Sequence, residues 1–422
     1  MTTAPRIAVL GLLGSGNLGN QGSLEAMLQF LRKAHPDSPI TCVCSGPEEV
    51  ERQYGIPSFS ITWYRPQRAT RSRLTTIGLK LFGKVADLVR TPRWVRRYDI
   101  VIVPGMGVLE TTLQLQPWGW PYALFLVFLS ARLSGAKTAL VGIGANVARE
   151  RSIRWLFRST ANLATYRSYR DEYSRDALRS MGVDTSRDEV CPDLAFALPP
   201  PPPPPRTPGR TVGLGVMAYH GSNADRARSE QIYSDYVVKI TEFARWLVDE
   251  GYRVRLFTGD PSDQAVVDSV AEDLRRTRPE LADSRLIVEP TASFGELTQQ
   301  LAAVDLVVAS RYHNLLAAMT GSKPAISISY AAKNDILMEQ MGLAEFRQPI
   351  QSLDVARLIG QFRALEVRAP QLTAGIESAC AESSDALQHQ YAALSAALFG
   401  PDRVVADHVK PGTPGNDKPQ EA

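Results

Sequence analysis

Two series of short β-branched runs, each interleaved with helical patterns, constrain this chain more than any other feature. In the first half, runs such as "RIAVLGLL", "DIVIVPG" and "KTALVGIG" alternate with helix-like segments. The same alternation starts afresh at "TVGLGVMAY", shortly after an unbroken run of prolines at 199–205. Because such alternation indicates parallel α/β units, the sequence predicts two Rossmann-like domains facing a cleft, where the carboxyl ends of both sheets converge.

The proline run suggests where the domains divide. We expect an N-terminal domain over 1–198, a semi-rigid linker over 199–209 and a C-terminal domain over 210–370. A C-terminal helix over 371–400 and a disordered tail over 401–422 complete the prediction. A linker is favoured over a ligand for an SH3-like partner, because the βα pattern resumes immediately after the prolines.

The composition is that of an ordinary globular protein. Hydrophobic residues make up 44% of the 422 residues and charged residues 22%. The net charge of +3 is too small to argue for nucleic acid, so no nucleic-acid partner is expected. The four cysteines have neither zinc-binding nor disulfide-framework spacing, which favours a reducing, cytoplasmic compartment without a metal site.

One segment bears on membrane contact. "WGWPYALFLVFLSARLSG" is the most apolar stretch, and it is shorter than the roughly 20 residues that a spanning helix needs. We expect a buried helix there, with peripheral contact with lipid as the alternative. Arginine-rich segments also flank a helix expected around 74–90, and they suit either a solvated charged face or an anionic lipid surface.

The first strand is followed by a glycine-rich turn. Gly14-Ser-Gly16-Asn-Leu-Gly19 matches G-x-G-x-x-G, the phosphate-binding signature of dinucleotide folds, and we expect a helix after it with Ser23 as its N-cap. Such folds place an acidic residue at the end of the second strand to hold the ribose. Here that strand ends in Ser-Gly-Pro. A nicotinamide oxidoreductase is therefore a minor alternative.

Cationic residues follow several predicted strands. Arg311 and His313 come directly after the strand "DLVVAS", Lys333 follows "PAISISY", and Arg170 ends "LATYRSYR" in the other half. Because the carboxyl ends of parallel strands open on one edge of a sheet, these side chains can converge. A helix N-terminus near Arg311 adds free N–H groups that favour an anion. The pattern suits a compact polyanion with carboxylate and phosphate groups, although surface salt bridges would explain it equally well.

Three blocks of this chain resemble the polysaccharide pyruvyl transferase family. "RDEYSRDALRSMGV" with "CPDLAFAL" is similar to the family's R-D-x-x-S helix and the P-D-x-x-F segment that follows it. "SRYHNLLAAMTGSKPAISISYAAKN" resembles its S-R-x-H helix and Y-x-x-K turn, and "GNLGNQGSLEAM" its first loop. One departure is Asn20, where family members commonly have Asp.

The resemblance implies a fold like that of GT-B glycosyltransferases and no cofactor. It implies transfer of pyruvate from phosphoenolpyruvate to two hydroxyls of a sugar in a polysaccharide, glycolipid or other glycan, which forms a cyclic ketal. By motif position, Arg170, Arg311 and Lys333 would bind the donor and His313 would be the catalytic acid/base, titrating near neutrality.

The first loop is then expected on the acceptor side, where Asn17, Asn20 and Gln21 would bind sugar hydroxyls. The cytoplasm, at or near the inner face of the membrane, is the expected location.

Two further alternatives stay open. A GT-B glycosyltransferase that uses a sugar nucleotide would share the architecture and the basic cleft. A non-catalytic carbohydrate-binding protein would share the fold.

Overall fold

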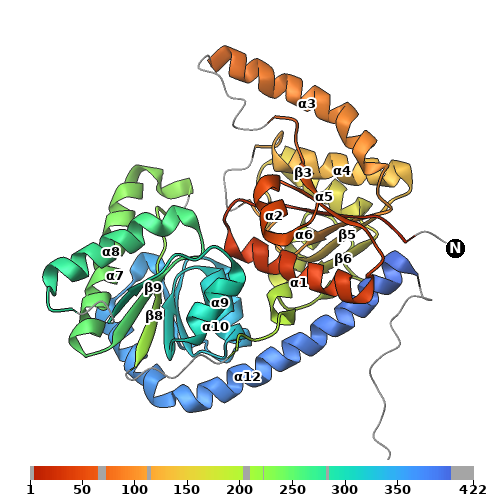
Figure 1. The fold of residues 1–422 in the computed structure, drawn as a ribbon. Helices are drawn as coiled ribbons and strands as arrows, with labels where there is room; N and C mark the ends of the chain where they lie inside the picture. Colours follow the sequence, from red (N-terminus) through yellow and green to blue (C-terminus); the bar gives the residue numbers. More distant parts are fainter. Residues whose placement is uncertain are drawn as a thin grey trace, which may run out of the picture.

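The computed structural model describes residues 4–64, 73–111, 116–202, 210–221, 223–281 and 285–400. Within these ranges the chain forms two α/β halves, each built on a parallel sheet (Figure 1). The expected pair of Rossmann-like domains is confirmed. The predicted tail at 401–422 and most of the predicted linker lie outside the described residues.

The N-terminal half holds seven described strands in the order β3-β2-β1-β4-β5-β6-β7. The strands are β1 (Ile7–Gly11), β2 (Ile40–Cys44), β3 (Ser58–Ser60), β4 (Ile100–Pro104), β5 (Lys137–Ile143), β6 (Tyr166–Tyr169) and β7 (Glu189–Val190). The helices are α1 (Leu18–Ala34), α2 (Pro47–Tyr54), α3 (Arg73–Val95), α4 (Trp120–Ser134), α5 (Arg151–Leu163), α6 (Glu172–Ser180) and the 3₁₀ turn η2 (Leu194–Ala197). Every residue of β1 and β4 is buried, as expected for central strands covered on both faces.

The C-terminal half holds six described strands in the order β10-β9-β8-β11-β12-β13. The strands are β8 (Thr211–Gly215), β9 (Arg253–Phe257), β10 (Leu286–Val288), β11 (Leu306–Ala309), β12 (Ala325–Ser329) and β13 (Arg347–Pro349). The helices are α7 (Ser229–Asp249), α8 (Gln264–Thr277), α9 (Phe294–Ala302), α10 (Tyr312–Thr320), α11 (Ala332–Gln340) and α12 (Val355–Phe399), with 3₁₀ turns η3 (Asn223–Arg228), η4 (Pro261–Asp263) and η5 (Ile350–Ser352). In each sheet the strand order changes direction at the first strand of that half, between β1 and β4 and between β8 and β11. Ligands of such folds bind at the carboxyl ends of the strands beside this point, and in this protein the two sets of strand ends meet at a common site.

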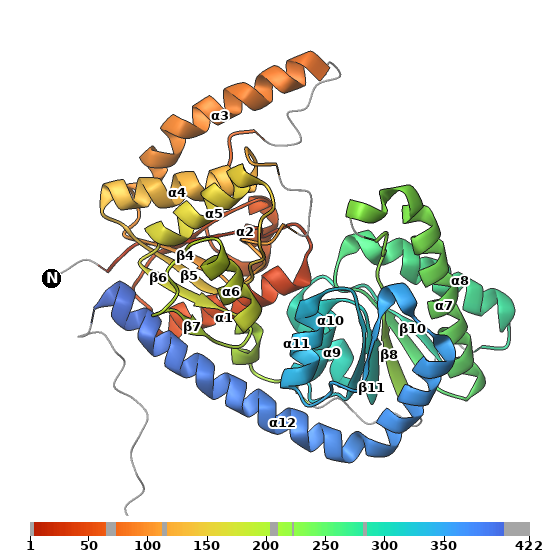
Figure 2. The same ribbon diagram turned by 180° about the vertical axis from the view of Figure 1, so that it is seen from behind.

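Helix α12 is longer than the C-terminal helix expected from the sequence. It begins at Val355 instead of 371 and carries Pro370 inside it. A proline forfeits one helical hydrogen bond, and here apolar packing on both sides of it continues the helix. Figures 1 and 2 show α12 leaving the C-terminal half and running back along the molecule to the N-terminal half.

The end of α12 is fastened to the N-terminal half by polar contacts. The ammonium group of Lys137 donates to the carbonyls of Ala397 and Leu398 at 3.0 and 2.9 Å. Gln390 donates to Ser168 Oγ at 2.6 Å. The first of these contacts satisfies carbonyls that the last turn of a helix leaves without partners.

Two sequence predictions in the N-terminal half have different outcomes. Helix α1 begins at Leu18, and Asn17 is its N-cap, so the expectation of a cap at Ser23 is wrong. Ser23 lies buried inside the helix. The apolar segment at 118–135 forms α4, whose inward residues are buried, as expected. Across the described residues, no helix has the length and apolarity needed to span a bilayer.

Candidate functional site

An ionic cluster joins the two halves where their strand ends meet. Arg170 follows β6, is 5% exposed, and contacts the carboxylate of Glu110 through Nη2. The other oxygen of that carboxylate, Oε2, lies 3.6 Å from Nζ of Lys333 in α11. Glu110 therefore lies between a cation of its own half and a cation of the opposite half. The predicted convergence of Arg170 and Lys333 is found, with a carboxylate between them.

His313 lies in the first turn of α10, next to the same cluster. Its imidazole is partly buried, and desolvation together with the positive charges of Lys333, Arg170 and Arg311 holds its pKa well below the ordinary value. The ring is therefore neutral at pH 7 in this conformation. This differs from the expectation of a histidine titrating near neutrality, because a sequence does not report burial among three cations.

The helix N-terminus of the opposite half covers His313. A Cβ placed on Gly19, in the first turn of α1, would overlap the imidazole ring. Nearby, the backbone N–H of Leu18 donates to the carbonyl of Gly259 at 3.2 Å. The N-terminus of α1 thus closes directly onto the residues after β9 and β11.

Tyr312 and Asp193 form a second link between the halves. The Tyr312 hydroxyl donates to Asp193 Oδ2 at 3.4 Å, and Arg170 lies 5.1 Å from the Tyr312 ring centroid, within cation–π distance. Burial raises the pKa of the Asp193 carboxyl. The segment "CPDLAFAL" therefore reaches the site through its aspartate.

Arg311 forms a bidentate ion pair with Asp263. Its Nε and Nη2 donate to the two carboxylate oxygens at 2.7 Å each. Asp263 is fully buried and also accepts from the backbone N–H of Ala218 and the hydroxyl of Thr258. The third nitrogen, Nη1, makes no hydrogen bond within the described part of the chain and is the group through which Arg311 could reach an anion.

The three amides predicted to meet an acceptor have different environments. Asn17 caps α1 through Oδ1 and approaches Asp260 Oδ2 at 3.5 Å through Nδ2. Asn20 donates to the carbonyl of Leu12 at 2.9 Å. Gln21 is buried, and its Oε1 has no hydrogen-bond partner in the described residues. Acceptor binding by these side chains stays a prediction, and in this conformation Asn17 and Asn20 hold the loop itself.

The glycines of the first loop serve contacts within the protein. Gly14 packs backbone to backbone against Gly46, and Gly16 packs against the ring of Pro261 in the other half. Both have positive φ values, 74° and 85°, which favour glycine. The G-x-G-x-x-G match is therefore explained by loop geometry and by the contact between the halves.

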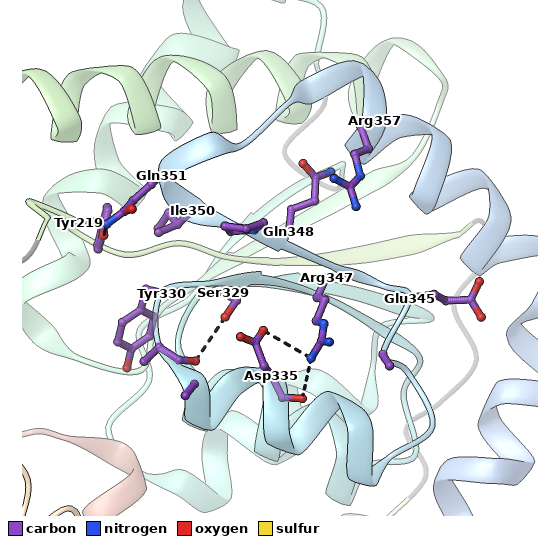
Figure 3. Close-up of a pocket in the computed structure, with 14 residues that line it drawn as sticks. Tyr219, Ser329, Tyr330, Asp335, Glu345, Arg347, Gln348, Ile350, Gln351 and Arg357 are labelled. Atoms are coloured by element: carbon purple, nitrogen blue, oxygen red, sulfur yellow. Dashed lines mark hydrogen bonds and ion pairs between the residues drawn. The ribbon is translucent and has the colours of Figure 1, made fainter. Parts of the chain in front are cut away.

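A pocket of about 650 Å³ opens on the C-terminal half beside this cluster (Figure 3). Figure 3 shows Tyr330 at one end, near Tyr219 and Gln351, with Asp335 and Arg347 further along. Tyr330 also lies 5.8 Å from Lys333 Nζ, measured to the ring centroid. Tyr330 thus lines the pocket and also lies beside Lys333 of the ionic cluster.

Sequence reasoning missed three carboxylates of the site. Asp263 lies in a short loop where a carboxylate is ordinarily explained by turn formation, Asp193 stands within the P-D-x-x-F segment, and Glu110 belongs to no motif. Glu110 and Asp193 bind cations or hydroxyls from segments far away in the sequence, so no local spacing marks them. An acidic residue shortly after a predicted strand is the sequence signal that marks Glu110, which follows β4.

Known proteins resemble the chain both in sequence and in fold. A family model described as polysaccharide pyruvyl transferase matches residues 17–331. The chain belongs to this family, and is therefore a transferase. The matched residues include Arg170, Arg311 and His313, together with the N-terminus of α1, which covers the histidine.

Solved structures of other polysaccharide- and sugar-related proteins share the fold of this pyruvyl transferase family member. The UDP-GlcNAc 2-epimerase from Methanocaldococcus jannaschii superposes with a TM-score of 0.56 at 11% identity, covering 85% of this chain and 91% of the epimerase. A Listeria monocytogenes protein assigned as a UDP-N-acetylglucosamine 2-epimerase gives 0.62 at 14% identity, with coverage of 94% and 98%. Anabaena HepE in complex with UDP and glucose gives 0.53 at 14% identity, with coverage of 93% and 99%. These likenesses confirm the GT-B-like architecture.

Proposed function

We propose that the protein transfers the pyruvyl group of phosphoenolpyruvate onto two hydroxyls of one sugar, forming a cyclic ketal and releasing phosphate. The observation that carries the proposal is the meeting of Arg170, Lys333 and His313 from opposite halves around one carboxylate. Fixed cations in a buried site suit a small donor with a carboxylate and a phosphate. The proposal assigns this neutralisation to arginine and lysine, without a resident cofactor.

The chemistry needs two proton movements. The methylene carbon of the donor takes up one proton and becomes a methyl group, and a sugar hydroxyl adds to the neighbouring carbon. Phosphate then leaves, and the second hydroxyl closes the ring. Of the two hydroxyl protons, one balances the proton gained by the methyl group and the other leaves with phosphate.

We assign the proton transfers to His313. Because its imidazole is neutral in the free protein, it starts as a base that accepts a hydroxyl proton. Binding of a polyanion would offset the charges of Lys333, Arg170 and Arg311, which lower its pKa. The pKa therefore rises when the donor binds, and the protonated ring becomes the acid that the methylene carbon needs.

The pocket in Figure 3 is the proposed binding site for further sugar units of the acceptor. Tyr219 and Tyr330 supply flat apolar faces, while Asp335 and Gln351 supply polar atoms for hydroxyls. We expect Asp335→Ala to raise the KM of the acceptor and to leave the KM of phosphoenolpyruvate within about twofold. The acceptor is proposed as a polysaccharide or lipid-linked glycan made on the cytoplasmic side of a membrane.

The deciding experiment is a phosphate-release assay with phosphoenolpyruvate and a panel of glycosides and glycolipids. The product mass should show a ketal-linked pyruvate. His313→Asn should lower the rate at least a hundredfold, while the exposed control His389→Asn retains it. Binding of a sugar nucleotide without binding of phosphoenolpyruvate would replace the proposal by a glycosyltransferase. Absence of phosphate release with every acceptor would favour a non-catalytic carbohydrate-binding protein.

A further inference from the structure

The large apolar residues of helix α3 (Arg73–Val95) face solvent, whereas a helix packed on a globular core turns them towards the protein. Six large side chains on it are between 50% and 65% exposed: Ile77, Leu81, Phe82, Val85, Leu88 and Val89. At 3.6 residues per turn they fall within an arc of about 140° on one side of the helix. A surface helix ordinarily turns such an arc inward.

The opposite side of α3 faces the protein and is partly polar. Asp87 is buried and accepts from the backbone N–H of Trp63 at 2.8 Å. Arg90 donates to the carbonyls of Ser60 and Ile61, the latter at 3.0 Å, and lies 3.7 Å from Asp87. These bonds hold α3 with its apolar arc towards solvent.

The position of α3 leaves this arc open. Figures 1 and 2 both show α3 at the outer margin of the N-terminal half, above α4, with its Arg73 end extending beyond the body of the protein. The exposed ring of Trp118 continues the apolar surface, at 6.0 Å from Tyr122 between ring centroids. Lys84 of α3 lies over that same Tyr122 ring at 5.7 Å.

The charges beside the arc are of one sign. Lys80 and Arg93 are exposed on its two margins, and Arg73, Lys84 and Arg90 complete the basic residues of the helix. The only acidic residue in α3 is Asp87, which is on the buried side. A second copy of the chain docked face to face would bring basic residues against basic residues. An anionic surface would neutralise them.

We propose that α3 is a docking element for an anionic phospholipid bilayer, lying in the plane of the interface with its apolar arc among the acyl chains. An apolar face with lysine and arginine at its margins and aromatic rings beside it is the pattern of interfacial helices. The proposed helix lies on the surface, and no helix among the described residues is long and apolar enough to cross a bilayer. This surface holds the N-terminal half against the bilayer.

The test is co-sedimentation of the full chain with vesicles, without donor or acceptor, so that its result is independent of the proposed reaction. The vesicles are phosphatidylcholine alone and phosphatidylcholine with about a third phosphatidylglycerol. We expect binding to the anionic vesicles at low salt and a loss of binding at high salt.

Two variants separate the apolar and the ionic contributions. Leu81→Ser combined with Phe82→Ser and Val85→Ser should weaken binding at least tenfold. Lys80→Glu combined with Arg93→Glu should weaken it at least about fivefold for each reversed charge. The control for the apolar variant is Val238→Ser with Val367→Ser, because both valines are exposed apolar residues of the C-terminal half. The control for the charge variant is Lys33→Glu with Arg275→Glu, which changes the net charge by the same amount at exposed positions away from α3. The controls should bind as the unaltered protein does.

Three results would overturn the proposal. The first is a failure of the unaltered protein to bind anionic vesicles. The second is equal binding by the triple serine variant, with circular dichroism showing that the variant is folded. The third is a dimer in light scattering that the triple variant converts to a monomer, which would assign the arc to a second copy.

Discussion

The imidazole ring of His313 lies against the backbone of Gly19, although the two residues belong to opposite halves of the molecule. No side chain fits between them. The contact shows that the N-terminus of α1 and the N-terminus of α10 close on one another with the neutral histidine between them. The N-terminus of α1 therefore restricts the access of a substrate to this ring.

We expect Gly19→Ala to hold the halves apart and to lower kcat/KM at least tenfold. The added methyl group would overlap the imidazole, whereas alanine suits the helix interior better than glycine does, so the fold should survive. Gly375→Ala in α12 is the matched control, because a Cβ there meets nothing within 4 Å. Steady-state kinetics and small-angle scattering on both variants test this. Full activity of Gly19→Ala would contradict the closure.

Glu110→Gln should lower the stability of the protein and increase the rise in melting temperature that the donor causes. The carboxylate neutralises Arg170 and Lys333, and removing one partner from a buried ion pair costs about 3 kcal/mol. Phosphoenolpyruvate should then raise the melting temperature of the variant more than that of the unaltered protein, since its anionic groups would take over the neutralisation.

Glu339→Gln provides the comparison, because Glu339 is an exposed partner of Arg347. Its loss should change stability by less than about 1 kcal/mol. Equal donor-induced shifts in all three proteins would refute the role of Glu110 as a stand-in for the donor anion.

The low pKa of His313 predicts how stability responds to acid. Above the ordinary histidine pKa, the folded and unfolded chains both carry a neutral ring. Below it, the unfolded chain binds a proton that the folded chain does not, so the free energy of unfolding falls as the pH drops. Between pH 6.5 and 5.5, we expect the unaltered protein to lose about 1 kcal/mol more than His313→Gln does.

Urea unfolding at these two pH values measures that difference. His389→Gln removes an exposed histidine and should follow the unaltered protein. An identical pH response in His313→Gln would show that the ring takes up its proton equally in both states.

The anchoring of α12 can be tested through Lys137. Lys137→Met keeps much of the side-chain length and removes the donor to the carbonyls of Ala397 and Leu398. We expect a loss of about 1–2 kcal/mol in the free energy of unfolding. The control Lys33→Met, at an exposed lysine, should leave the free energy of unfolding unchanged. Urea unfolding of both variants measures the difference. No loss in Lys137→Met would mean that packing alone holds the helix end.

Much of the fold could be predicted from local patterns, and the site only in part. The strand ends that carry Arg170, Arg311 and Lys333 follow from the alternation of short apolar runs and helices, and Asp171 caps the helix that follows Arg170. The start of α1 is not predicted correctly, because Asn17, within the glycine-rich segment, caps the helix instead of Ser23.

The remaining features depend on tertiary contact. Glu110 meets Lys333 only once both halves have folded and docked. The suppression of the pKa of His313 depends on burial by Gly19, which is almost three hundred residues away in the chain. The sequence also indicates a helix near 74–90 with basic flanks, but tertiary contacts such as the bonds of Asp87 and Arg90 determine that its apolar side faces outward.

The return of α12 to the first half has a consequence for biosynthesis. The N-terminal sheet leaves the ribosome first, yet Lys137 and Ser168 meet their partners only when residues 390–398 have been translated. The first domain to be made is thus the last to be completed. A chain stalled or clipped before α12 ends would leave its earliest segment with an uncovered surface, and a fragment carrying α12 supplied separately should restore it.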